Sequence, residues 1–185
     1  MSKIKLNATS GGGSVALEGP ASLGSDKVIK FPNSPNVITQ VLQTVKTDTF
    51  STTSAGFSDI TGLSVAITPT SSSSKILLHY DANVGGNEIV FVRLMRGSTA
   101  IGIGDAGNNR QRVTQGGVFR NNNDDKLSIF SGSFLDSPSS TSTQTYKLQV
   151  FLYSGTVTVN MPKNDTDASY TGRGISTITA MEVTQ

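Results

Sequence analysis

The sequence has no cysteine and no tryptophan, and His79 is its only histidine. Without cysteine the chain forms neither disulfide bonds nor the thiolate sites of zinc and iron–sulfur centres. Charged residues are 15% of the chain and the net charge is +2, which excludes a dedicated nucleic-acid-binding surface and disorder driven by charge. No apolar run approaches the roughly 20 residues of a membrane-spanning helix. The sequence therefore predicts no nucleic-acid partner and no membrane insertion.

Serine, threonine, asparagine and glycine take the place of the missing charge, with 19 glycines in 185 residues. Threonine favours strands, whereas serine, asparagine and glycine favour turns and oppose helices. The composition therefore predicts an all-β protein of extracellular or virion type. Residues 1–6 lack the apolar segment of a signal peptide, so we expect synthesis in a cytoplasm.

Residues 1–36 differ from the rest in their residue pattern, because they consist of short apolar fragments separated by glycine and proline. Such fragments bury too little surface to form a core of their own. The segment is predicted to be an N-terminal anchor or stem, ordered by packing on the rest of the chain or on identical copies. A partly disordered tail is the alternative. Its candidate trimer or stem contacts are Ile4, Leu6, Val15, Leu17, Val28, Ile29 and Phe31.

Residues 37–185 carry repeated period-two patterns, for example the alternation of apolar and polar side chains over residues 146–152. Strict alternation indicates antiparallel strands with one buried face, and roughly eight to ten of them at this spacing predict a β-sandwich. Residues 75–80 and 88–95 are apolar in both phases, which predicts central strands covered on both faces. Residues 37–46 have some helical character, but their β-branched content favours a strand at least as well.

The run GIGDAG at residues 102–107 matches the GxGxxG pattern of nucleotide-binding folds. In those folds the glycines open a helix whose N-terminus binds a pyrophosphate. Residues 108–112 are NNRQR, which do not begin an apolar-periodic helix. The match therefore predicts a glycine-bent strand or turn, with no bound nucleotide.

His79 and Asp81 lie two positions apart, so a strand places both on the same face. No serine in a nucleophile context accompanies them, and a structural histidine pair is the favoured interpretation over catalysis. No pair of carboxyl groups stands out for glycoside hydrolysis either. The sequence predicts no enzyme and no catalytic residue.

Two acidic clusters, residues 121–125 and 164–167, carry oxygen ligands at loop spacing. Neither has the spacing of an EF-hand, and turn formation by Asn and Asp side chains is the simpler interpretation. A calcium ion bound in one of these loops is the alternative. Apart from that ion, no cofactor is predicted.

Several segments resemble virion proteins. NATSGGGSVALEGP (residues 7–20), followed by KVIKFP (27–32), resembles the short stem module of tail-fibre and other virion proteins of marine tailed bacteriophages. TDTFSTT (47–53), GLSVAITP (62–69), RLMRGSTAIGIGD (93–105) and STITAMEV (176–183) resemble the domain that often follows this module. The strand order is also similar to the trimeric jelly rolls of the C1q and tumour-necrosis-factor type, in which the closing strand runs along the threefold centre.

This resemblance implies a homotrimeric, non-enzymatic surface appendage of a phage virion, a tail fibre or fibre-like protein. Residues 1–36 would attach it to other virion proteins, and the jelly-roll domain of residues 37–185 would face outward. It would bind a host surface glycan or outer-membrane component. The alternatives are a capsid decoration or head-fibre protein without a receptor role and, more remotely, a carbohydrate-binding module or a glycan-degrading enzyme.

Adhesion on a rigid sandwich is expected to use loops on the rim that points away from the particle. Two turn clusters are candidates for this rim. Their residues are Asn121, Asn122, Asn123, Asp124 and Asp125 in the first cluster, and Asp136 and Ser137 in the second.

Overall fold

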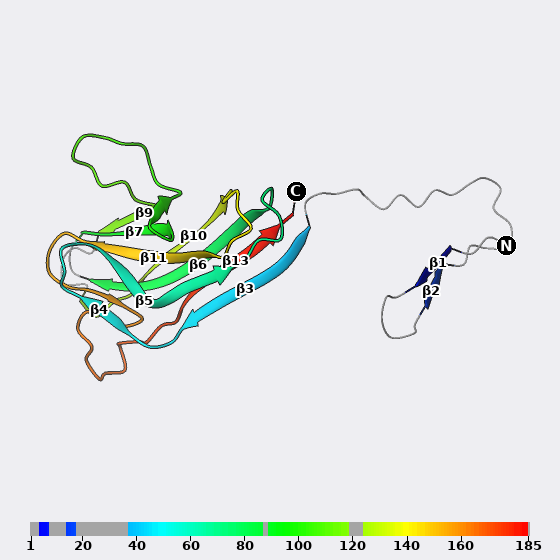
Figure 1. Cartoon of the computed structure of the whole chain (residues 1–185). Helices are drawn as coiled ribbons and strands as arrows, with labels where there is room; N and C mark the ends of the chain where they lie inside the picture. Colours follow the sequence, from blue (N-terminus) through cyan, green and yellow to red (C-terminus); the bar gives the residue numbers. More distant parts are fainter. Residues whose placement is uncertain (1–3, 8–13, 18–36, 87–88, 119–123, 185) are drawn as a thin grey trace, which may run out of the picture. The chain divides into compact units, whose positions relative to one another are not determined.

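A computed structural model describes most of the chain, and its regular elements are all β-strands (Figure 1). The described residues are 4–7, 14–17, 37–86, 89–118 and 124–184. The chain divides into two units, Met1–Ser34 and Pro35–Gln185. Within the described residues there is no helix of the length and hydropathy needed to span a bilayer.

The first unit contains a two-stranded ladder. Strands β1 (Ile4–Asn7) and β2 (Ser14–Leu17) pair antiparallel, with Ile4 opposite Leu17 and Leu6 opposite Val15. A two-stranded hairpin of this size is at best marginally stable alone. The stem contacts predicted for these four residues stay a prediction, and Val28, Ile29 and Phe31 lie outside the described residues.

The second unit is built from two antiparallel sheets. The first sheet runs in the order β10-β6-β13-β3, and the short strands β12 and β4 extend it where β6 ends. Its strands are β3 (Ile38–Lys46), β4 (Phe50–Thr52), β6 (Lys75–Gly86), β10 (Ser128–Asp136), β12 (Val157–Val159) and β13 (Ser176–Val183).

The second sheet runs in the order β5-β11-β7, and β8 and β9 pair with successive parts of the free edge of β7. Its strands are β5 (Gly56–Ile67), β7 (Ile89–Arg96), β8 (Thr99–Ile101), β9 (Gln115–Val118) and β11 (Gln144–Leu152).

The strand order is that of a jelly roll. With the short strands β4, β8 and β12 set aside, the sandwich strands in chain order are β3, β5, β6, β7, β9, β10, β11 and β13. The first, eighth, third and sixth of these form one sheet, and the second, seventh, fourth and fifth form the other. This is the double Greek-key arrangement of a jelly roll, so the predicted fold class is confirmed.

The core lies between the two sheets and follows the predicted alternation. On β11, Tyr146, Leu148, Val150 and Leu152 are at most 1% exposed, while the residues between them face outward. The prediction for residues 75–80 holds for one face only. The side chains of β6 that point away from the second sheet are only partly covered, because no third layer of described residues lies over them.

A buried carboxylate ties the two sheets together. Asp136, at the end of β10 in the first sheet, is 6% exposed. Arg96 Nη1 on β7 donates to both of its carboxylate oxygens at 3.0 and 2.8 Å. The hydroxyl of Tyr146 on β11 donates to the same carboxylate at 2.7 Å, and burial together with this bond raises the pKa of Tyr146.

Glu182 on β13 is fully buried and joins three segments. Gln40 Nε2 donates to its carboxylate at 2.6 Å, and both the amide and the hydroxyl of Thr70 donate to it at 2.7 Å. Burial opposes ionisation, but these donors outweigh it and lower the pKa of Glu182 from 4.5 to about 2.

We predict that Tyr146→Phe lowers the free energy of unfolding by about 1–2 kcal/mol, because the variant loses a hydrogen bond to a buried carboxylate. Urea unfolding at one fixed protein concentration measures the change. Tyr170→Phe is the matched control, since Tyr170 is 71% exposed, and it should leave stability unchanged. Equal stability of the two variants would contradict the prediction.

We predict that Glu182→Gln is less stable than the parent protein at neutral pH and that the difference disappears in acid. The folded-state pKa lies below the unfolded one, so the stabilisation is complete above about pH 4.5 and is lost as the pH falls toward 2. Urea midpoints of both proteins between pH 7 and pH 2 test this. A difference that does not change with pH would show that the ionised carboxylate is not the stabilising form.

Candidate functional site

The two ends of the sandwich carry different parts of the chain. At one end, called the terminal end, the Thr184 amide donates to the Val37 carbonyl oxygen at 3.0 Å, so β3 begins where β13 finishes. At the other end, called the far end, β6 finishes at Gly86 and β7 begins at Ile89. Strand β10 runs from the far end to the terminal end, since Ser128 pairs with Val84 and Asp136 with Ile76.

The strand directions separate the two loops predicted to form one rim. Asp124 and Asp125 precede β10 and lie at the far end, whereas Asp136 and Ser137 lie at the terminal end. Ser137 is exposed, but the Asp136 carboxylate is buried and held by Arg96 and Tyr146, so it is not available to a partner. The described residues of the two clusters therefore do not form a common rim.

Asp124 belongs to a network with the loop that precedes β13. Lys163 Nζ donates to its carboxylate at 2.8 Å, and the Asn164 amide donates to its carbonyl oxygen at 2.8 Å. Asp125 is half-buried beside it. The neighbouring predicted residues Asn121, Asn122 and Asn123 lie outside the described residues.

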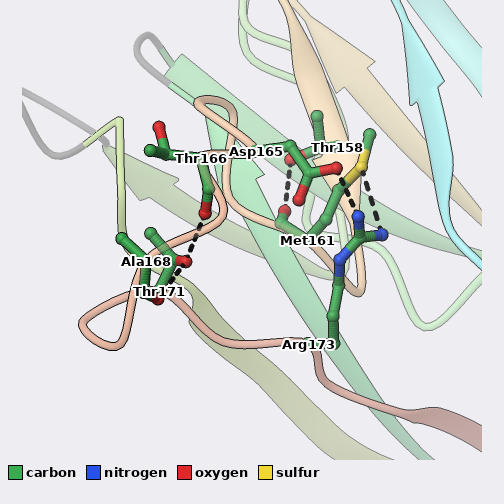
Figure 2. A network of polar contacts seen from close by, with 7 residues as sticks. All are labelled: Thr158, Met161, Asp165, Thr166, Ala168, Thr171 and Arg173. Carbon is green, nitrogen blue, oxygen red and sulfur yellow. Dashed lines mark hydrogen bonds and ion pairs between the residues drawn. The ribbon is translucent and has the colours of Figure 1, made fainter.

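Several polar side chains of the loop between β12 and β13 are bound within the loop itself (Figure 2). Arg173 pairs with Asp165 and reaches the sulfur of Met161 at 3.9 Å. Thr171 Oγ1 donates to the carbonyl oxygens of Thr166 and Ala168 at 2.6 and 2.9 Å. These residues surround a small polar hollow of about 280 Å³.

This loop contains the second acidic cluster considered for calcium. The carboxylate of Asp165 is already neutralised by the guanidinium of Arg173, which takes the place that a cation would need. Among the described residues no group of three His, Cys, Asp or Glu side chains converges on a common point. The contacts in this loop favour the interpretation of the cluster as a turn.

The GIGDAG run forms the glycine-bent turn that the sequence predicts. Gly102 has a φ of +57°, and a Cβ placed on it would lie 3.0 Å from the ring of Phe134. The run opens a loop, residues 102–114, that leaves β8 and returns to β9. A nucleotide-binding helix does not follow it.

Loop 102–114 covers part of the outer face of the second sheet and creates a hollow of about 420 Å³ at the far end. Two phenylalanines of adjacent strands, Phe91 and Phe151, lie in it with stacked rings whose centroids are 5.5 Å apart. The ring of Phe57 packs on Phe151 from the side, at 5.0 Å between centroids. The hollow is lined by Ile89, Phe91, Asn109, Arg110, Gln111, Val113, Phe151 and Tyr153.

The sequence patterns did not predict this hollow. The signal available was the presence of Phe91 and Phe151 in the outward phase of two alternating strands, where a polar side chain is expected. The placement of the polar residues 109–111 over them depends on the path of loop 102–114, which the pattern does not encode.

The outer face of the first sheet carries a row of apolar side chains across four strands. Val41 on β3 pairs with Met181 on β13, Met181 pairs with Leu77 on β6, and Leu77 pairs with Leu135 on β10. Val41 is 56% exposed and Leu135 is 45% exposed. A continuous apolar row on a surface strand face is characteristic of a protein interface.

The next row on the same face contains the predicted histidine pair. His79 Nε2 lies 3.2 Å from Asp81 Oδ2, and both side chains are about half exposed. The side chains beside His79 in its row are Thr179 and Ser133. These neighbours are polar and uncharged, which fits the structural interpretation of His79.

The chain is similar only at low sequence identity to the solved structures compared with it below. No protein-family model and no curated protein matches the chain. A structure of infectious bursal disease virus, strain Gx, is 16% identical with a TM-score of 0.41, over 94% of this chain and 43% of that chain. T=1 particles derived from a mutant VP2 protein of that virus are 14% identical with a TM-score of 0.35, over 97% of this chain and 46% of that chain. A VP2 subviral particle of the same virus is 12% identical with a TM-score of 0.33, over 92% of this chain and 48% of that chain. The chain spans less than half of these structures, and likeness at such TM-scores carries no argument about function.

Proposed function

We propose that this chain is a non-enzymatic surface protein of a bacteriophage virion, a homotrimer whose jelly-roll domain faces outward and contributes to host-surface adhesion. The resemblance of the sequence to tail-fibre and other virion proteins supports the virion role. The observation that carries the trimer is the apolar row formed by Val41, Met181, Leu77 and Leu135 on the outer face of the first sheet.

Strand β13 suits the centre of a symmetric assembly. Its outward side chains, Thr177, Thr179, Met181 and Val183, are all uncharged. Near a symmetry axis each residue meets copies of itself, so a charged residue there would be repelled by its equivalents. The charged residues of this face lie instead on β6, beside β13. The number of copies follows from the resemblance to C1q-type and tumour-necrosis-factor-type jelly rolls.

The hydrogen bonds and ion pairs made by the acidic side chains support a non-enzymatic role. Acid–base catalysis needs carboxyl groups that can reach a substrate. Most of the described carboxylates with hydrogen bonds are held by basic or amide side chains of the same chain. These are Asp48 by Lys46, Asp59 by Lys147 and Gln149, Asp124 by Lys163, Asp136 by Arg96, Asp165 by Arg173 and Glu182 by Gln40.

The trimer predicts a mass near three times 19.4 kDa by light scattering at low micromolar concentration. Met181→Lys places three ammonium groups at the centre of the interface and should reduce the mass to that of a monomer. Thr145→Lys is the control, because Thr145 is exposed on the outer face of the second sheet. Circular dichroism checks that both variants fold.

A monomeric parent protein would overturn the trimer. A Met181→Lys variant that remains trimeric would show that the copies associate through another surface. If both lysine variants dissociate the assembly equally, the effect comes from added charge rather than from the apolar row.

The anchoring role of the N-terminal segment makes a separate prediction. Removal of residues 1–36 should leave the jelly-roll domain folded, because the described core lies wholly within residues 37–184. The truncated protein should no longer appear in purified particles, whereas the full chain should. Truncated protein in particles at the normal copy number would overturn the anchoring role. Loss of host binding distinguishes an adhesin from a decoration or head-fibre protein.

A further inference from the structure

We propose that the hollow under loop 102–114 binds a saccharide residue that carries a carboxylate group. This inference rests on the proposed adhesive function and names the site and the ligand class that would serve it. The hollow has a volume of about 420 Å³, within the range of small-molecule binding sites.

The floor of the hollow suits the apolar face of a sugar ring. Phe91 and Phe151 are fixed by stacking on each other, and Phe57 supports Phe151 from the side. Tyr153 lies at the margin with 68% of its surface exposed, so its ring is free to cover a ligand. The carbon–hydrogen face of a pyranose packs on such rings, while its hydroxyl groups remain directed to the rim.

The rim supplies the polar groups that a sugar needs. Within the described part of the chain, the side chains of Asn109, Arg110 and Gln111 form no hydrogen bond or ion pair. The two amides each donate and accept, as sugar hydroxyl groups do. In the polar loop between β12 and β13, by contrast, Arg173 pairs with Asp165 and Thr171 donates to the carbonyl oxygen of Thr166 (Figure 2).

Arg110 selects for a negative charge on the ligand. Among the described residues that line the hollow, Arg110 is the cation and none is acidic. By contrast, the guanidinium groups of Arg93, Arg96 and Arg173 are bound by Gln149, Asp136 and Asp165. An unpaired guanidinium over an apolar floor matches a carboxylate, which it can bind through two parallel hydrogen bonds.

The loop is held in place before any ligand arrives. Arg112 Nε donates to the Gly104 carbonyl oxygen at 2.7 Å, and the Gly104 amide donates to Val113 at 3.2 Å. The Thr114 amide donates to Val92 on β7 at 2.9 Å, which fastens the end of the loop to the second sheet. A preformed rim reduces the entropy lost on binding.

The hollow also lies in the right place for adhesion. Its lining residues on β7 and β11 belong to the far end of the sandwich, opposite the end where β3 begins. It opens on the outer face of the second sheet, whereas the proposed trimer contact lies on the outer face of the first sheet. Trimer formation through that contact therefore leaves the hollow open to a host glycan.

The test is binding of the full-length protein to an oligosaccharide panel. The panel contains galacturonate, mannuronate, guluronate, glucuronate and sialic acid oligomers, their carboxyl-reduced counterparts, and poly-glutamate. At least one acidic oligosaccharide should bind, and its reduced counterpart should bind about tenfold more weakly. Arg110→Gln should lose the same factor, and Tyr153→Ala should weaken both forms.

Two variants serve as matched controls. Lys126→Gln removes one exposed positive charge elsewhere, and Tyr170→Ala removes a tyrosine that is 71% exposed on another loop. Neither should change binding. The proposal is overturned if no acidic oligosaccharide binds, if the reduced forms or poly-glutamate bind equally well, or if binding survives in both Arg110→Gln and Tyr153→Ala.

The outcome is separable from that of the proposed function. If particles carrying Arg110→Gln adsorb to host cells as well as the parent, the hollow is not the adhesive site and the trimeric virion role stands. If the chain is monomeric or absent from particles, the proposed function fails whatever the panel shows.

Discussion

The insertion of β13 between β3 and β6 is the constraint on which the rest of this structure depends. In the described ladders β3 pairs with β13 alone. Strand β3 therefore cannot join the first sheet until β13, the last strand of the chain, is in place. Gln40 and Glu182, which bind each other across this junction, are 142 positions apart. Closing so long a loop has a large entropic cost before any contact rewards it, which predicts slow, late completion of the sheet. The same strand buries Ile178, Ala180 and the carboxylate of Glu182 on its inner face, and its outward side chains are all neutral.

Sequence patterns predicted the sandwich because a buried face imposes a period of two. The alternation over residues 146–152 lies within β11, and all but the first of the ambiguous residues 37–46 form β3. The pattern over residues 75–80 gave a partly wrong expectation. Leu77 is apolar, as a buried residue would be, but it lies on the outer face of the sheet, and sequence does not distinguish burial within a subunit from burial between subunits.

The candidate sites depended more heavily on distant contacts. Asp136 precedes a serine-rich turn, which favours an exposed loop, but it is the last residue of β10, and Arg96 and Tyr146 from the other sheet bind its buried carboxylate. Residues 109–111 have the composition of an ordinary polar turn. Only the fixed path of their loop brings them over two phenylalanines of β7 and β11. Local composition predicts turns well, whereas the partners of a turn are decided by the topology.

The hydrogen bond between Thr184 and Val37 has a practical consequence for protein engineering. A short linker joining these neighbouring positions would close the domain into a ring without stretching either strand. New chain ends opened in the turn at residues 153–156, where Gly155 has a φ of +87°, would then emerge at the far end. Such a circular permutant would carry a fused cargo beside the loops rather than beside β3, and it would display that cargo on the opposite pole of the domain.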